Sequence, residues 1–199
     1  MRSIYIILLL TLDVKKRNHE VDAVNGLVLA APSKEDADAI REYAAEFPGD
    51  RMRVTLEEGR IPGLDHLEEY ESVEAWLDYT AEMAGKIDWY MSVRKRDKRI
   101  VGFICLRHSL KYDDDDPEFC SHIGYSIRPS ERGRGYAKEQ LRLCLDKARA
   151  LGLSRVRIVC RDINVGSAKT IQAVGGVYVD TLYGEESQMN ILRFDVPTA

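Results

Sequence analysis

The sequence predicts one mixed α/β domain in which helices cover both faces of a mostly antiparallel sheet. The chain has 199 residues, which suffices for one domain with a substantial core. Apolar residues make up 45% and charged residues 31% of it, the composition of an ordinary globular protein. Segments with strand and helix patterns follow in the order strand, helices, antiparallel strands, helix, strand, helix, strands.

The first elements follow from local signals. Residues 27–30 are typical of a short buried strand, and Ser33 followed by Asp36 is a helix-start signature. Apolar residues at helical spacing continue this helix as far as Pro48. The stretch 56–83 is rich in acidic residues, and its apolar residues predict an amphipathic helix in the part that follows the turn at Pro62. Its acids form either a solvated face or a rim that attracts a cationic acceptor.

The second half alternates strands and helices. Three strands are predicted at 89–93, 100–106 and 121–127, with an acidic hairpin tip at 111–117. A long helix with one apolar stripe follows at 135–151. The last predicted elements are a strand, a helix and two strands, at 155–160, 165–174, 177–182 and 189–196.

Residues 1–25 differ from the rest of the chain. The apolar run Ile4–Leu10 is too short for a membrane-spanning helix, which needs about 20 residues. Charged residues, rather than small ones, follow it, which disfavours a secretion signal. We therefore expect an N-terminal extension of unknown role at 1–25, a domain at 26–199, and no membrane partner.

Charge and cysteines restrict the function further. The net charge of −4 gives no general attraction for nucleic acid, so such a partner is not expected. Four cysteines without a C-x-x-C pair argue against zinc-ribbon and redox motifs, and no metal-ligand constellation appears. Reduced thiols predict a cytoplasmic protein.

One glycine-rich loop carries the chemical signal. It lies between the strand that ends at Ile127 and the helix that begins near Gly135, so backbone N–H groups and the positive helix end converge there. Such a loop predicts an anion site, although an exposed loop without a ligand fits the pattern equally well. Four basic side chains would supply charge: Arg128, Arg132, Arg134 and Lys138.

The segment Arg132-x-x-Gly135-x-Ala137 resembles the acyl-CoA pyrophosphate loop of the GNAT superfamily of N-acetyltransferases. Asn164-x-x-Ser167, followed by Gly175, is similar to the second motif of that family. The resemblance covers about 27–196 and is strongest to bacterial predicted acetyltransferases near the ribosomal-protein-acetylating branch. It implies a fold in which strands 4 and 5 splay apart around the pantetheine arm.

The resemblance also implies a reaction, the direct transfer of an acetyl group from acetyl-CoA to an amine on a small molecule, antibiotic, peptide or protein. The implied cofactor-binding residues come from strand 4, the loop and the second motif. They are Tyr125, Ser126, Ile127, Arg132, Gly133, Arg134, Gly135, Tyr136, Ala137, Asn164 and Ser167.

Three residues are candidates for proton transfer. Many family members use a tyrosine seven residues after the asparagine as the acid, but Ile171 occupies that position here. Ser167 is the first substitute, with local capping beside Asn164 as its alternative role. For the base we predict His122, with Glu118 as a further candidate. A hairpin symmetric about residue 115 would place His108 opposite His122 as a proton relay.

The sequence is also compatible with two rival functions. A domain of the same fold could hold acyl-CoA as a sensor or interaction domain without turnover, which the absent tyrosine favours. The Arg-Gly loop could instead contact RNA, with steep salt dependence. Strand exchange or edge pairing at the C-terminal strands would allow a homodimer.

Overall fold

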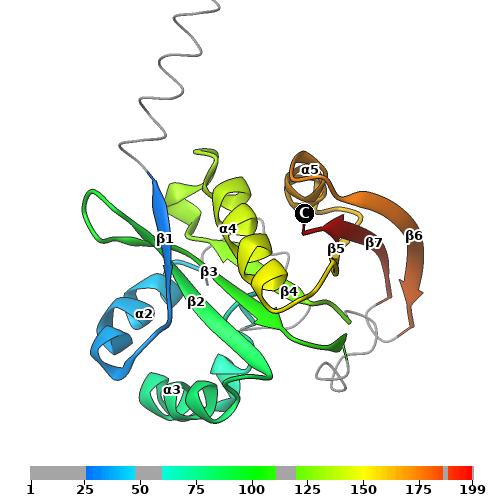
Figure 1. Ribbon diagram of the computed structural model, residues 1–199. Helices are drawn as coiled ribbons and strands as arrows, with labels where there is room; N and C mark the ends of the chain where they lie inside the picture. Colours follow the sequence, from blue (N-terminus) through cyan, green and yellow to red (C-terminus); the bar gives the residue numbers. More distant parts are fainter. Residues whose placement is uncertain (1–25, 48–59, 111–119, 186–187, 199) are drawn as a thin grey trace, which may run out of the picture.

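The computed structural model describes residues 26–47, 60–110, 120–185 and 188–198 and contains two antiparallel sheets with packed helices (Figure 1). The first sheet has the order β1-β2-β3-β4 and consists of Leu27–Ala30, Ile87–Arg94, Ile100–Arg107 and Ile123–Ile127. The second has the order β5-β7-β6 and consists of Arg155–Arg161, Met189–Pro197 and Val177–Gly184. The helices are α2 (Ala37–Ala44), α3 (Val73–Glu82), α4 (Tyr136–Ala150) and α5 (Val165–Ala173).

Most predicted elements are present, but α3 is later and shorter than its acidic segment suggests. Ser72 caps α3 by accepting a hydrogen bond from the Ala75 N–H at 3.1 Å, so the helix begins only at Val73. The residues before it turn instead at Gly63, whose φ of 88° favours glycine. A Cβ at Gly63 would lie 2.7 Å from the Phe103 carbonyl oxygen, so this turn packs directly on β3.

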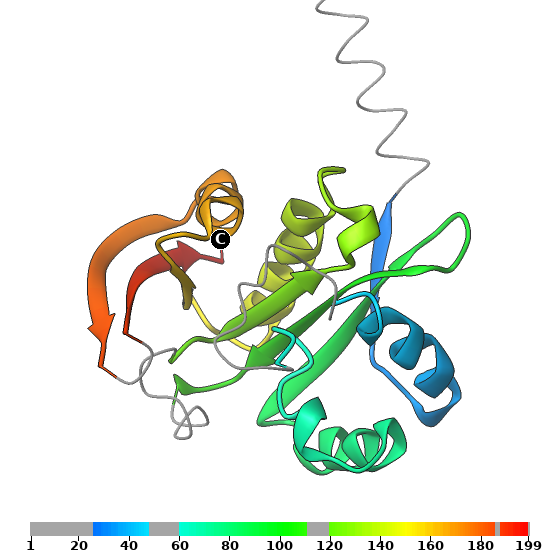
Figure 2. The ribbon, with the colours of Figure 1, turned by 180° about the vertical axis from the view of Figure 1, so that it is seen from behind.

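Helices cover both faces of the first sheet, as predicted (Figures 1 and 2). On one face, α2 and α3 bury a core that includes Trp76, Trp89 and Phe103. On the other, Leu141 of α4 packs against Ile104. The second core also contains residues of β5, so α4 joins the two sheets through one apolar layer.

The two sheets meet at the N-terminal ends of β4 and β5. The His122 N–H donates to the Arg157 carbonyl oxygen at 2.8 Å, and the Arg157 N–H donates to His122 Nδ1 at 2.9 Å. Beyond this junction the strands belong to separate sheets and diverge (Figure 1). The expected splay of strands 4 and 5 is therefore confirmed, and it opens toward the strand ends that precede α4 and α5.

The N-terminal extension, the acidic hairpin tip and Glu118 lie outside the described residues. Within the described ranges, none of the helices has the length and apolar character needed to span a bilayer.

Candidate functional site

The glycine-rich loop between β4 and α4 forms an open cradle. Gly133 and Gly135 have φ values of 77° and 86°, and a Cβ at either position would meet no atom within 4 Å. Within the described part of the chain, the backbone N–H groups of residues 133–137 donate no hydrogen bond. These unpaired donors at a helix N-terminus suit an oxyanion ligand such as a phosphate.

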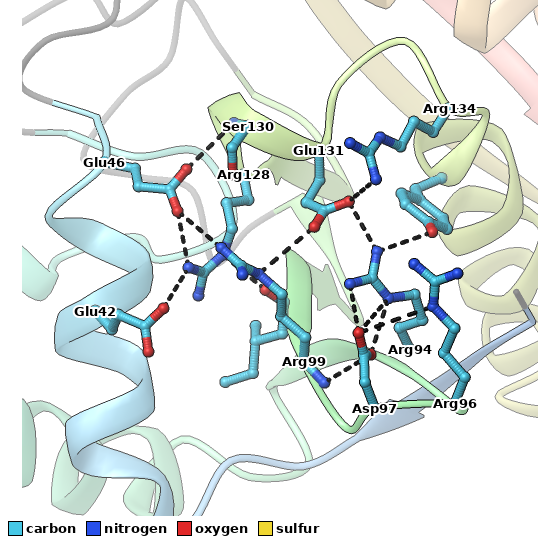
Figure 3. Close-up of polar contacts among 12 residues, drawn as sticks. Glu42, Glu46, Arg94, Arg96, Asp97, Arg99, Arg128, Ser130, Glu131 and Arg134 are labelled. Carbon is cyan, nitrogen blue, oxygen red and sulfur yellow. Dashed lines mark hydrogen bonds and ion pairs between the residues drawn. The ribbon is translucent and has the colours of Figure 1, made fainter.

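Arg128 does not belong to this cradle, which corrects the sequence interpretation. Its side chain is only 2% exposed and pairs through Nη1 with Glu42 at 2.9 Å and Glu46 at 2.8 Å (Figure 3). Its Nε donates to the Ile100 carbonyl oxygen at 2.8 Å. Arg128 therefore anchors the loop to α2 and β3, and its charge is already neutralised.

A second buried ion pair holds the loop from the other side (Figure 3). The Glu131 carboxylate lies 2.8 Å from Arg94 Nη1 and 2.9 Å from Arg134 Nη1. Arg94 also donates to the buried Tyr136 hydroxyl at 3.2 Å, so the Tyr136 side chain faces the core rather than the cradle. Only the backbone of Tyr136 is thus oriented to meet a ligand.

The remaining cations of the loop differ in how far their side chains are exposed and engaged by other residues. Arg132 Nε donates to the Ile127 carbonyl oxygen at 3.2 Å, and its guanidinium lies 5.9 Å from the Phe47 ring centroid. Arg134 is paired with Glu131 but half exposed, and Lys138 is exposed. Arg134 and Lys138 are therefore the loop cations best able to reach a phosphate.

A group of hydroxyl and thiol side chains connects the diverging strands to α5. Tyr125 of β4 and Ser167 of α5 share a hydrogen bond of 2.9 Å, in which either oxygen can donate. Burial raises the pKa of Tyr125 to about 12 and that of Cys160, on β5, to about 11, so both keep their protons at neutral pH. Ile171, at the position of the family tyrosine, is fully buried in the core.

Asn164 caps α5, since its side-chain oxygen accepts the Ser167 N–H at 3.0 Å. This bond uses the backbone of Ser167, so the Ser167 hydroxyl is free to contact Tyr125. Local capping and contact with a reacting group are therefore compatible roles for the Asn164 motif.

Two other β4 residues are placed by core contacts. The Ser126 hydroxyl lies 3.0 Å from the Tyr43 hydroxyl on the α2 face, and the Ser126 carbonyl accepts from buried Gln140 of α4 at 3.3 Å. The Ile127 side chain packs in a small core with Tyr136. The β4 backbone is thus held firmly from both faces where the strands diverge.

His122 lies at the closed end of the splay, and His108 is not its partner. Arg107, rather than His108, pairs with His122, because the hairpin register is one residue from the expected one. His108 instead contacts Asp88 at 2.9 Å. Burial, and then the charges of Arg157 and Arg107, lower the pKa of His122. With Nδ1 accepting the Arg157 N–H, a neutral His122 carries its proton on Nε2.

Asp65 is a site candidate that the sequence interpretation missed. Its Oδ2 accepts from Cys105 Sγ at 2.9 Å and from Arg107 Nη2 at 2.9 Å. Among the described residues its Oδ1 accepts only the Gly63 N–H, at 3.3 Å, and it lies 3.6 Å from where a Cβ on Gly124 would stand. The carboxylate therefore lies beside Gly124, together with the Cys105 thiol and the Gly63 N–H. The Pro-Gly turn before Asp65 was the local signal.

The acidic residues of α3 are largely engaged locally. Glu74 pairs with Arg41, and Asp78 lies 2.7 Å from Lys34. Glu68, in the preceding turn, lies 3.1 Å from Arg60. These pairs favour a solvated, self-neutralised surface over an acidic rim for a cationic acceptor.

Comparisons with known proteins agree with this architecture. A family model described as an acetyltransferase (GNAT) domain matches residues 26–177. Ribosomal-protein-S5-alanine acetyltransferase from Vibrio fischeri is 18% identical with a TM-score of 0.64, the match covering 85% of this chain and 92% of that one. RimJ from Mycobacterium smegmatis, solved in complex with CoA-disulfide, is 17% identical with a TM-score of 0.66. The match covers 86% of this chain and 81% of RimJ.

A third solved structure belongs to a different acceptor class. A spermidine N-acetyltransferase chimera from Vibrio cholerae and hSSAT is 16% identical with a TM-score of 0.62, covering 86% of this chain and 95% of that one. No curated protein sequence matches the chain. At these identities the solved structures demonstrate the shared fold, and the family model carries the assignment.

Proposed function

Because the chain belongs to the GNAT acetyltransferase family and therefore transfers an acetyl group to an amine, we propose that acetyl-CoA donates this group where β4 and β5 separate. The observation that carries the proposal is the splay itself. The strands are joined at His122 and Arg157 and belong to separate sheets beyond that point, so the outer edge of β4 has no strand partner there among the described residues. An extended pantetheine arm could hydrogen-bond that free edge. The free cysteines support a cytoplasmic location, which stays a prediction.

The cradle suits the pyrophosphate of the donor. Its unpaired N–H groups, its open glycines and the charges of Arg134 and Lys138 would hold phosphate oxygens without rearrangement of the loop. The remaining predicted contacts, through Tyr125, Ser126, Ile127 and Asn164, stay predictions; for Ser126 and Ile127 they would involve the β4 backbone, because both side chains make core contacts. No group of three or more metal-ligating side chains occurs among the described residues.

We assign proton donation to the Tyr125 and Ser167 hydroxyls. When the thioester breaks, the departing thiolate needs a proton, and both hydroxyls stay protonated at neutral pH. Their hydrogen bond allows Ser167 to give a proton and recover one from Tyr125. The pair would thus replace the tyrosine that Ile171 displaces.

The amine must lose a proton, and we look for the group that takes it on the face of β4 away from Tyr125 and α4. The Asp65 carboxylate lies beside Gly124, and its Oδ1 accepts only a long hydrogen bond from Gly63 among the described residues, so we propose it as the proton acceptor. We prefer it to the sequence-predicted His122, which nothing here tests in catalysis, while Glu118 lies outside the described residues and stays a prediction. For His122, the Nδ1 bond to Arg157 leaves no free lone pair on the neutral ring.

The proposal is tested by incubating the protein with acetyl-CoA and a library of amines and peptides, with mass spectrometry of the products and thiol detection of CoA. We expect at least one acetylated amine. Gly135→Val should raise the Kd for acetyl-CoA about tenfold or more, because it adds strain at positive φ and fills the cradle. Gly152→Val, at a similar φ beyond the other end of α4, is the matched control and should leave that Kd unchanged. Tight binding of acetyl-CoA with no product across the library would refute catalysis.

A further inference from the structure

Arg161 is a buried cation with two guanidinium nitrogens that lack a hydrogen-bond partner among the described residues. It is the last residue of β5 and only 5% exposed, yet its Nε and Nη2 make no hydrogen bond among the described residues. Burial lowers the pKa of this guanidinium. Buried arginines are normally paired, since an unpaired buried charge is costly, so this side chain is positioned to meet a ligand.

The neighbouring arginines on the same sheet face behave differently. Arg157 lies 3.2 Å from Asp195, and Arg193 lies 2.6 Å from Asp180. Both of these pairs are partly exposed, whereas the more deeply buried Arg161 forms no ion pair with the residues that the structure describes. The unpaired state is thus specific to the position at the end of β5.

This position adjoins the proposed reaction site. Cys160 faces the core with α4, close to Ser167 and Tyr125. Because successive strand residues point to opposite faces, Arg161 faces the side of β5 away from α4. On β4, that side carries Gly124 and the Asp65 carboxylate, since both cores place α4 on the opposite face. We call this side of β4 and β5 the acceptor face.

We propose that Arg161 binds a carboxylate of the acceptor, so that the enzyme acts on amines that also carry a carboxylate, such as amino acids and acidic peptides. This inference rests on the proposed function, in which the proton donors Tyr125 and Ser167 lie on the α4 side and the proton acceptor Asp65 lies on the opposite side. A planar guanidinium forms paired hydrogen bonds with a carboxylate, and the low exposure of Arg161 strengthens them. Arg161 would then hold the carboxylate end of such an acceptor, while Oδ1 of Asp65, whose Oδ2 pairs with Arg107, would accept the proton from its amine end.

The same charge disfavours polyamines. A polycation entering beside Arg161 would bring like charges together in a poorly solvated place. This chain shares its fold with the spermidine N-acetyltransferase chimera, whose named substrate is a polycation. Arg161 instead implies an acceptor that carries a negative charge.

Stability distinguishes a ligand-binding role from a structural one. In the unliganded protein, Arg161→Met should raise the Tm by about 3 °C or more, because it removes an uncompensated buried charge and keeps the apolar stem. Arg193→Met, the paired control, should not raise it. A Tm that falls in Arg161→Met would mean that the guanidinium has a structural partner, and would overturn the proposal.

Specificity is measured with amine pairs that differ only in the carboxylate: glycine and methylamine, β-alanine and ethylamine, and peptides with Asp or Asn at the second residue. We expect wild type to prefer the carboxylate member by about 10- to 100-fold in kcat/KM. Arg161→Met should abolish this preference, Arg161→Lys should retain part of it, and Arg193→Met should keep it. Equal use of both members by wild type would overturn the proposal while leaving acetyl transfer intact.

A binding measurement covers the case in which no amine reacts. N-acetyl-β-alanine and N-ethylacetamide are the acetylated products of β-alanine and ethylamine. Their effects on the Tm of the CoA-bound protein can be measured without catalysis. Stabilisation by the carboxylate product alone, lost in Arg161→Met, supports the inference even if catalysis fails. If Arg161→Met instead raises the Kd for acetyl-CoA tenfold with acceptor preference unchanged, Arg161 serves the donor and the inference is wrong.

Discussion

The Tyr125 hydroxyl lies 2.9 Å from the Ser167 hydroxyl and links β4 to α5 across the diverging strands. Neither residue is a conspicuous proton donor alone. Together they supply two protonated oxygens in a chain that has Ile171 at the position of the family tyrosine. Burial raises the pKa of Tyr125 to about 12, so its hydroxyl keeps its proton at neutral pH.

Removing one hydroxyl should slow turnover without weakening donor binding. Ser167→Ala is expected to lower kcat by about 100-fold, with the Kd for acetyl-CoA changed less than threefold, because the Asn164 cap uses the Ser167 backbone. Steady-state kinetics with calorimetric binding measures both. If the pair works as one relay, Tyr125→Phe added to Ser167→Ala should cost little more. An unchanged kcat would remove Ser167 from the mechanism.

His122 is tested through the acidic limb of the pH–rate profile. We expect His122→Ala to retain this limb, because the Nδ1 lone pair accepts the Arg157 N–H and leaves no acceptor site on the neutral ring. Loss of the limb in His122→Ala would identify His122 as the base. The parent profile, recorded with the same acceptor, is the control.

The lowered pKa of His122 also predicts a stability effect with a definite sign. Folded His122 binds a proton less readily than the unfolded chain, so its contribution to stability is present above pH 6.5 and is lost as the pH falls through the folded pKa. Urea unfolding should therefore show a smaller loss of stability on acidification in His122→Gln than in the parent. An identical loss in both proteins would contradict this assignment.

Gly102 should not tolerate a side chain. A Cβ there would collide with Gln140 Oε1 and lie 2.8 Å from the Ser126 carbonyl oxygen, so Gly102→Ala must reorient the Gln140 amide and shift the β4 backbone. We expect a loss of about 1–3 kcal/mol in the free energy of unfolding. Gly166→Ala, whose Cβ would meet only Asn164 at 3.7 Å, is the control and should not destabilise the protein. Equal free energies of unfolding for the two variants would contradict this prediction and would mean that Gln140 and the β4 backbone move aside at little cost.

Glu131 should be essential for the shape of the loop. Its substitution by Gln leaves buried Arg94 without one of its carboxylates, which we expect to cost about 3–5 kcal/mol in chemical denaturation. Asp38→Asn, which breaks an exposed pair with Arg41, should cost less than about 1 kcal/mol. A similar small cost for Glu131→Gln would mean that Asp97 alone satisfies Arg94.

Local chemistry predicted much of this protein in advance. The helix start at Ser33, the cap at Asn164 and the glycine cradle depend on residues within a few positions of one another, and each is present. Strand and helix bounds followed for the same reason. The acidic stretch was the exception, since the turn at Gly63 is maintained by contact with β3, far away in sequence.

The sequence by itself thus determined the element order, the anion loop and the membership of a fold with two splayed strands. Only the tertiary structure decided which charges are free: it buries Arg128 between two glutamates, brings Asp65 over Gly124 and leaves Arg161 unpaired. It also shifted the β3–β4 register by one residue, which separates His108 from His122. The physical reason is range, because burial and ion pairing depend on residues tens of positions apart, whereas caps and turns depend on adjacent ones.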